Sequence, residues 1–224
     1  MVFLSFNSHR HGPLPSPTEP ESGGTTEDPI DAQLVEGILR NDREAWGALY
    51  TRHQSRVFAV CFQMVHDREL ASDLTHDTFV KVIKGIASFD GRARFTTWMT
   101  RIAMNVCLSK IRSEKLRRHA SLDAPTKDRE HGRGADLEQN REHSHTSSVE
   151  ASEQKERVLA ALRKLDPDQR AVLILADAQG LSYESIAATL QVAVGTVKSR
   201  LFRARAALKD KMELLDKPDY SQTP

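Results

Sequence analysis

The stretch LSYESIAATLQVAVGTVKSRLFRARAAL, residues 181–208, reads as two helices joined by a tight turn. Ser182 precedes the first helix and is a good N-cap, because its hydroxyl can accept a hydrogen bond from a first-turn amide. Residues 191–193 form the predicted turn. Apolar residues then recur at helical spacing and predict a buried stripe at Val194, Val197 and Leu201. This arrangement is typical of a helix-turn-helix.

The opposite face of the second helix is polar and basic. Its members are Thr196, Lys198, Ser199, Arg200, Arg203 and Arg205. In a helix-turn-helix this face enters the DNA major groove, where early side chains reach base edges and later arginines reach phosphates. A solvated basic helix on an ordinary bundle is the alternative. We favour DNA binding, because the cap, the turn, the buried stripe and the basic face all agree with it.

The charge of the chain is locally segregated, although its net value is small. The 224 residues carry a formal net charge of +1. Basic clusters occur at residues 110–118 and 198–211, whereas acidic residues gather at 19–31 and 150–156. Because local patches rather than net charge attract phosphates, this distribution is compatible with nucleic-acid binding.

Cysteine usage and hydropathy indicate a cytoplasmic protein. Cys61 and Cys107 lie inside apolar helical patterns, so we expect buried thiols and neither a disulfide nor a metal site. The N-terminal sequence MVFLSFNSHR lacks a leading basic region and is a poor signal peptide. No apolar run is long enough to span a bilayer, so no membrane insertion is expected.

Helical periodicity without a strand pattern predicts an all-α fold of two small domains joined by a flexible linker. Residues 1–28 are rich in Pro, Ser, Gly and Glu and are predicted to be a disordered extension. The first helical domain is predicted at 29–118 and the second at 153–216, with a tail at 217–224. Residues 119–152 contain many charges and few apolar side chains, which favours a flexible linker.

Two upstream segments complete a family pattern. The chain reads DLTHDTFVKV at residues 73–82 and FDGRARFTTWMTRIAMN at residues 89–105. Together with the helix-turn-helix, these segments closely resemble the sigma-70 family of bacterial transcription initiation factors. The small two-domain extracytoplasmic-function (ECF, group IV) subgroup fits best. The resemblance implies a sigma region 2-like helical bundle followed by a sigma region 4-like helix-turn-helix.

The resemblance also implies three sets of contacts. The DLTHDTF helix corresponds to the segment that docks on a coiled coil of the largest RNA polymerase subunit, through Asp73, His76, Asp77, Phe79 and Ile83. The following turn and helix correspond to the unit that melts the promoter −10 element and holds a flipped base, through Gly91, Arg92, Arg94, Phe95, Arg101, Asn105, Lys110 and Arg112. The C-terminal unit corresponds to the reader of the −35 element, through Thr196, Lys198, Ser199, Arg200, Arg203 and Arg205.

Several of these residues also have a purely structural interpretation. The acidic residues of the DLTHDTF helix can simply complement its helix dipole. The spacing of Trp98 suits the core better than base stacking, and Phe95 is divided between the two roles. Gln191 stands where the family's turn often carries glycine. If its φ is positive, a residue other than glycine costs on the order of 1 kcal/mol there.

The expected function is that of a sigma factor that directs promoter-specific transcription initiation in response to a stress or other signal. Core RNA polymerase, promoter DNA and an anti-sigma factor are the expected partners. No enzymatic constellation is visible, so neither catalysis nor a cofactor is expected. A self-sufficient helix-turn-helix regulator and an interaction protein that never touches DNA remain as alternatives. The segment FDGRARFTTW, followed by a basic helix, favours a melting unit over a sensor domain.

Overall fold

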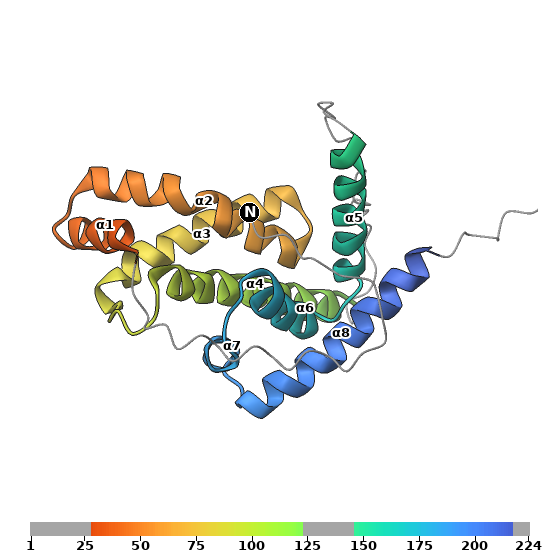
Figure 1. The fold of residues 1–224 in the computed structure, drawn as a ribbon. Coiled ribbons are helices and arrows are strands. Elements are labelled where there is room, and N and C mark those ends of the chain that lie inside the picture. The colour runs from red at the N-terminus through yellow and green to blue at the C-terminus, as the bar shows by residue number, and fades with distance from the viewer. Residues whose placement is uncertain (1–27, 123–145, 217–224) are drawn as a thin grey trace, which may run out of the picture.

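The computed structural model describes residues 28–122 and 146–216, and within these ranges all regular structure is helical. The predicted N-terminal extension, most of the predicted linker and the tail lie outside the described residues. The elements, in chain order, are α1 (Pro29–Leu39), α2 (Arg43–Val65), α3 (Arg68–Gly85), η1 (Ile86–Ser88), α4 (Phe95–Leu122), α5 (Thr146–Arg163), α6 (Pro167–Leu173), η2 (Ile174–Ala178), α7 (Tyr183–Leu190) and α8 (Val194–Asp216). The prediction of an all-α fold with two helical domains is confirmed (Figure 1).

The first domain is a bundle in which α2, α3 and α4 pack against one another and α1 packs on α2. Aspartate side chains start its first three helices. Asp28, Asp42 and Asp67 accept hydrogen bonds from first-turn amides at 2.8–2.9 Å, which satisfies donors that a helix start leaves unpaired. The core between these helices contains large, fully buried side chains such as Leu49 and Met99.

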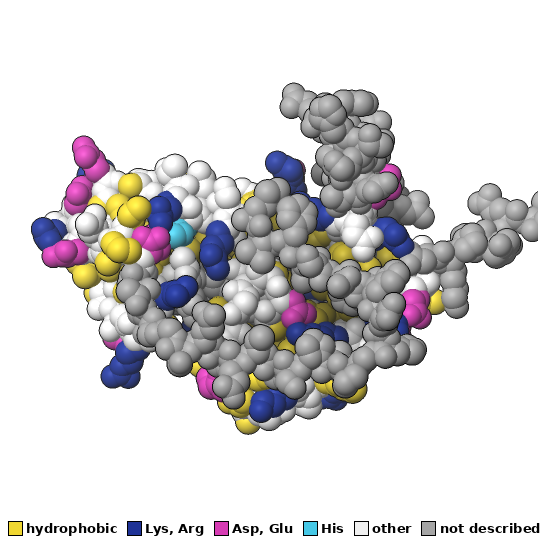
Figure 2. All heavy atoms as spheres, in the orientation of Figure 1, with side chains coloured by type: hydrophobic (Ala, Val, Ile, Leu, Met, Phe, Trp, Pro, Cys, Tyr) yellow, Lys and Arg dark blue, Asp and Glu magenta, His cyan; other side chains and the backbone are white. Residues whose placement is uncertain are grey.

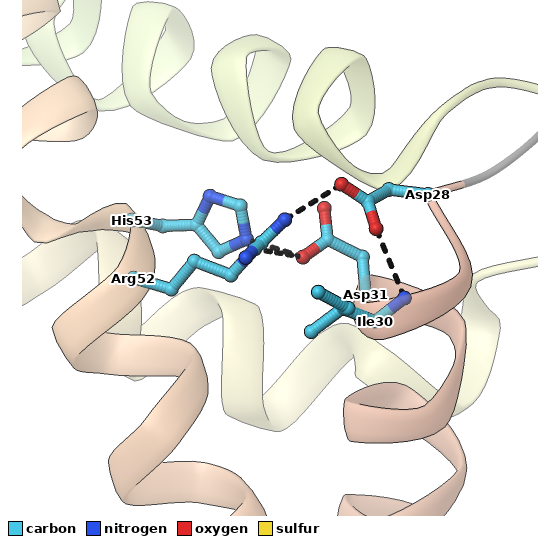
Figure 3. Close-up of polar contacts among 5 residues, drawn as sticks. All are labelled: Asp28, Ile30, Asp31, Arg52 and His53. Atoms are coloured by element: carbon cyan, nitrogen blue, oxygen red, sulfur yellow. Dashed lines mark hydrogen bonds and ion pairs between the residues drawn. The ribbon is translucent and has the colours of Figure 1, made fainter.

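A polar cluster around the buried side chains of Asp31 and His53 joins α1 to α2 (Figure 3). The Asp31 side chain is 2% exposed, and its Oδ1 lies 2.9 Å from Arg52 Nε and 2.8 Å from His53 Nε2. Arg52 also donates to Asp28 Oδ2 at 2.6 Å, while Asp28 Oδ1 caps the amide of Ile30. That amide and the Arg52 guanidinium lower the pKa of Asp28. The cluster therefore joins the start of α1 to the middle of α2.

The second domain contains the helix-turn-helix. Ser182 caps α7 by accepting from the Ser185 amide at 3.2 Å, and Val197 and Leu201 of α8 are buried, as the sequence predicts. Gln191 ends α7 with φ 55° and ψ 47°, so the expected positive φ is present at a residue other than glycine. The π-helical segment η2 between α6 and α7 has no signal in the sequence.

The two domains lie against each other (Figure 1). Helices α6 and α7 contact α4, and α5 and α6 contact α2. The helices also extend into both ends of the predicted linker, because α4 continues to Leu122 and α5 begins at Thr146. None of the helices in the described residues is long and apolar enough to cross a membrane.

Candidate nucleic-acid interface

Helix α8 presents the predicted −35 face, and the side chains of this face differ in exposure and in the contacts they make. Lys198, Ser199 and Arg203 are exposed, whereas Thr196 and Arg200 are partly buried. The Lys198 ammonium lies 5.8 Å from the ring centroid of Tyr183 on α7, a cation–π contact that steadies the side chain. Arg203 Nε donates to the Ser199 carbonyl at 3.3 Å within the helix.

Two arginines of this face are engaged by carboxylates. Arg205 donates to Asp177 Oδ1 at 2.6 Å and Oδ2 at 3.3 Å, and this pairing raises the pKa of Arg205. Arg200 Nη1 lies 3.9 Å from Asp168 Oδ2. The Arg205–Asp177 pair ties α8 to η2, so Arg205 has a structural role besides any DNA contact.

Phe202 belongs to the exposed surface of α8 and was missed by the sequence prediction. Phe202 is 70% exposed, and it lies between the buried Leu201 and the exposed Arg203 in the sequence. An apolar ring on a basic face suits contact with the methyl group of a thymine in the major groove. The signal in the sequence was a phenylalanine at a position that the helical period places outside the buried stripe.

The predicted −10 unit combines the turn before α4 with one exposed side of α4. Gly91 has φ 70°, a conformation that favours glycine. Arg92 is exposed and pairs with Asp90, its Nε lying 3.2 Å from Oδ2, and Arg94 is also exposed. Asn105 is exposed on α4. These side chains are accessible to a single strand.

The remaining cations of this unit lie further along α4. Arg101 is partly buried. Lys110 Nζ lies 3.4 Å from Glu114 Oε1, and Arg112 Nη2 lies 3.9 Å from Asp168 Oδ1 of the second domain. An apolar groove adjoins the turn and is lined by residues of α1 together with Phe89 and Gly91.

Two aromatic residues assigned to contacts are core residues instead. Phe95 is fully buried and packs against Phe89 and Trp98, with ring centroids 5.6 and 5.7 Å away, so it cannot stack on a base in this arrangement. Phe79 is 2% exposed and lies 4.7 Å from the Tyr50 ring, which corrects its assignment to the docking face. Both sit at the edge of a predicted face, where helical periodicity alone does not separate inside from outside.

The predicted docking face of α3 otherwise lies on the surface. Asp73, His76 and Asp77 are exposed. Ile83 is 42% exposed, and Val80, which the sequence analysis did not single out, is 41% exposed. The face therefore combines acidic groups with apolar side chains, which suits a basic, partly apolar partner helix.

The charge of the visible surface is spread over several places. Figure 2 shows lysine and arginine side chains on separate parts of the molecule, with acidic side chains among them.

Cys61 and Cys107 are buried and free. No cluster of three or more metal-ligating side chains occurs among the described residues.

Comparison with known proteins decides between the remaining classes. The sigma-70 region 2 model matches residues 49–117, and the sigma-70 region 4 model matches residues 155–208. The chain is 33% identical to the RNA polymerase sigma-H factor of Pseudomonas aeruginosa, over 83% of this chain and 95% of that protein. The chain belongs to the sigma-70 family. It is also 31% identical to the ECF RNA polymerase sigma-E factor of Haemophilus influenzae, over 83% of this chain and 96% of that protein.

Solved sigma-factor structures share the fold of this sigma factor. CnrH in complex with the cytosolic domain of CnrY matches with TM-score 0.55 and 23% identity, over 84% of this chain and 99% of that chain. RpoE in complex with the anti-sigma factor NepR from Bartonella quintana matches with TM-score 0.57 and 24% identity, over 76% and 98%.

Family membership gives this ECF sigma factor its role. It binds core RNA polymerase and promoter DNA and directs promoter-specific initiation of transcription. Sigma factors are initiation factors rather than enzymes.

Proposed function

We propose that the two DNA-facing units of this sigma factor divide promoter recognition between them. Helix α8 reads the duplex −35 element through Lys198, Ser199 and Arg203, with Phe202 as an apolar contact. The turn at Gly91 and the exposed side of α4 open the −10 element. The separation of these surfaces onto two domains is the observation that carries the assignment.

The chemistry of each surface suits its task. A duplex is read by side chains that enter the major groove from one helix, and α8 offers hydroxyl, cationic and apolar groups side by side. A melted strand needs cations for its phosphates and a recess for an extruded base. Arg92 and Arg94 supply the cations, Asn105 can hydrogen-bond a base edge, and the groove beside Gly91 supplies an apolar recess.

The exposed face of α3 is proposed as the polymerase contact, through Asp73, His76, Asp77 and Ile83, with Val80 added to it.

We further infer that the protein acts in the cytoplasm and answers to a stress signal. An anti-sigma factor is the expected regulator. Of two structures that share the fold, RpoE was solved with the anti-sigma factor NepR and CnrH with the cytosolic domain of CnrY, which supports this expectation.

Paired variants test the division of labour on a promoter recovered from a genomic library by transcription with core polymerase. We expect Arg203→Ala to weaken closed-complex formation, because it removes an exposed cation that α8 offers to the −35 duplex. Lys209→Ala is the matched control, since Lys209 is an exposed cation further along α8. Equal binding by the two variants would remove Arg203 from the −35 contact.

Strand opening is tested separately by permanganate footprinting with polymerase present. Asn105→Ala is expected to impair opening while leaving closed-complex formation nearly intact. Thr51→Ala, an exposed polar residue of α2, is the control. Normal opening by the Asn105→Ala variant would show that the exposed side of α4 does not read the −10 element at this position.

A further inference from the structure

A buried arginine joins the two domains. Arg170 of α6 is 8% exposed. Within its own domain it donates to the carbonyls of Leu162, Arg163 and Leu165 at 3.0 Å. It also donates to the carbonyl of Met64 in the last turn of α2. One guanidinium therefore binds the carboxyl ends of α5 and α2, where the helix dipoles favour a cation.

The end of α2 beside this arginine is enclosed as well. His66 follows α2 with φ 56°, and neither ring nitrogen has a hydrogen-bond partner although both are buried. Burial, reinforced by Arg170 and Arg163, lowers the pKa of His66 to about 4. His66 is therefore neutral near pH 7, and protonation of its ring disfavours the interdomain contact.

A single carboxylate links both DNA-facing units. Asp168 lies two residues before Arg170 on α6, and its side chain is 46% exposed. Its Oδ1 is 3.9 Å from Arg112 Nη2 of α4, and its Oδ2 is 3.9 Å from Arg200 Nη1 of α8. Arg112 belongs to the proposed −10 unit and Arg200 to the predicted −35 face, so Asp168 sets one carboxylate beside a cation of each unit.

We propose that the free chain adopts a closed arrangement in which the Asp168 carboxylate bridges Arg112 of α4 and Arg200 of α8. DNA must displace Asp168 before its phosphates can contact both arginines. This inference rests on the proposed function for the roles of the two arginines. The closure itself is argued from the Arg170 and Asp168 contacts and from the packing of α5, α6 and α7 on the first domain, which do not depend on those roles. Within this arrangement, Asp168 acts as an internal competitor of phosphate.

The contacts that close the chain are suited to reversal. The Arg112 side chain is 67% exposed and the Arg200 side chain is 30% exposed. Pairs at such exposure contribute little individually and are screened by salt. A polyanion that offers phosphates to both arginines at once can therefore open the closed arrangement.

The domain arrangement is tested in the full chain by electron–electron spin distances. Spin labels are attached at Gly47→Cys on α2 and Ala206→Cys on α8, both exposed positions, while the native thiols Cys61 and Cys107 are buried. Asp168→Asn is compared with Asp210→Asn, which makes the same change of charge at an exposed residue of α8. We expect Asp168→Asn to shift the distance distribution to longer values and Asp210→Asn to match the parent.

Competition with DNA is tested without polymerase, using a fluorescein-labelled duplex of random sequence at low salt, because phosphate contacts are independent of sequence. Asp168→Asn should bind about two- to tenfold more tightly than Asp210→Asn, as expected for the release of two exposed ion pairs. The proposal is overturned if the two variants give the same distances or the same affinities.

A further variant separates failure of this proposal from failure of the assigned DNA roles. Arg200→Ala is measured in the Asp168→Asn background. A loss of duplex binding there supports both the role of Arg200 and its masking by Asp168. Unchanged duplex binding refutes the DNA role of Arg200 and with it the competition, while the spin distances still report whether the domains close.

Discussion

Replacement of Asp31 by alanine is expected to loosen α1 from the first domain. Its carboxylate oxygen Oδ1 lies within hydrogen-bond distance of His53 Nε2, at 2.8 Å, and it also accepts from Arg52 Nε at 2.9 Å. The His53 side chain is 6% exposed, so the substitution leaves a buried polar group without a partner, at a cost of about 1–3 kcal/mol. Arg52 is more exposed and keeps its ion pair with Asp28, so the loss of the Arg52–Asp31 pair adds about 0–1 kcal/mol. The free energy of unfolding should fall by about 1–4 kcal/mol in total.

Tryptophan fluorescence isolates this effect. Both tryptophans of the chain, Trp46 and Trp98, lie in the first domain, so urea unfolding followed by their emission reports on that domain and not on the second. Asp73→Ala, at an exposed acid of α3, is the control and should change stability by about 0.5 kcal/mol or less. If Asp31→Ala unfolds at the same urea concentration as Asp73→Ala, the buried cluster does not stabilise the domain.

Three further outcomes follow from individual residues. Gln191→Gly should stabilise the second domain by up to about 1 kcal/mol, because it removes the strain of a positive φ, and hydrogen exchange of α7 and α8 amides measures this. Phe202→Ala should weaken polymerase-dependent binding of a −35 duplex by about 1–3 kcal/mol when a thymine lies under the ring. An equal loss of affinity for every −35 sequence would argue against a base contact. The folded pKa of His66, about 4, is below its ordinary value of about 6.5, so the open form binds more protons between these values and closure weakens as pH falls through that window. Spin distances should accordingly lengthen from pH 7 to pH 5 in the parent but not in His66→Asn, with His76→Asn, an exposed histidine of α3, behaving as the parent.

Local patterns predicted the helix-turn-helix well because its determinants are close together in sequence. Ser182, Val197 and Leu201 fulfil their assigned roles through contacts within one short unit. The strained turn at Gln191 was also visible, since a departure from glycine has a definite backbone meaning. These features depend on helical period, capping and turn chemistry, which a sequence carries directly.

Residues whose role depends on distant partners were not predicted. Phe79 and Phe95 lie at the margins of their helical faces, and only the packing of neighbouring helices places them in the core. Asp31 and His53 are 22 positions apart, and nothing in the sequence pairs them. The bond from Arg170 to the Met64 carbonyl spans 106 positions and joins two domains that were expected to be independent.

The position of Asp168 between two arginines has a consequence for the ionic-strength dependence of DNA binding. Each protein cation that neutralises a phosphate releases condensed counterions from DNA, which steepens the loss of affinity with salt. Arg112 and Arg200 must first separate from Asp168, and the freed carboxylate then attracts cations from solution. The net number of cations released on DNA binding is therefore smaller. The free protein should therefore show a shallower salt dependence than its number of phosphate contacts implies.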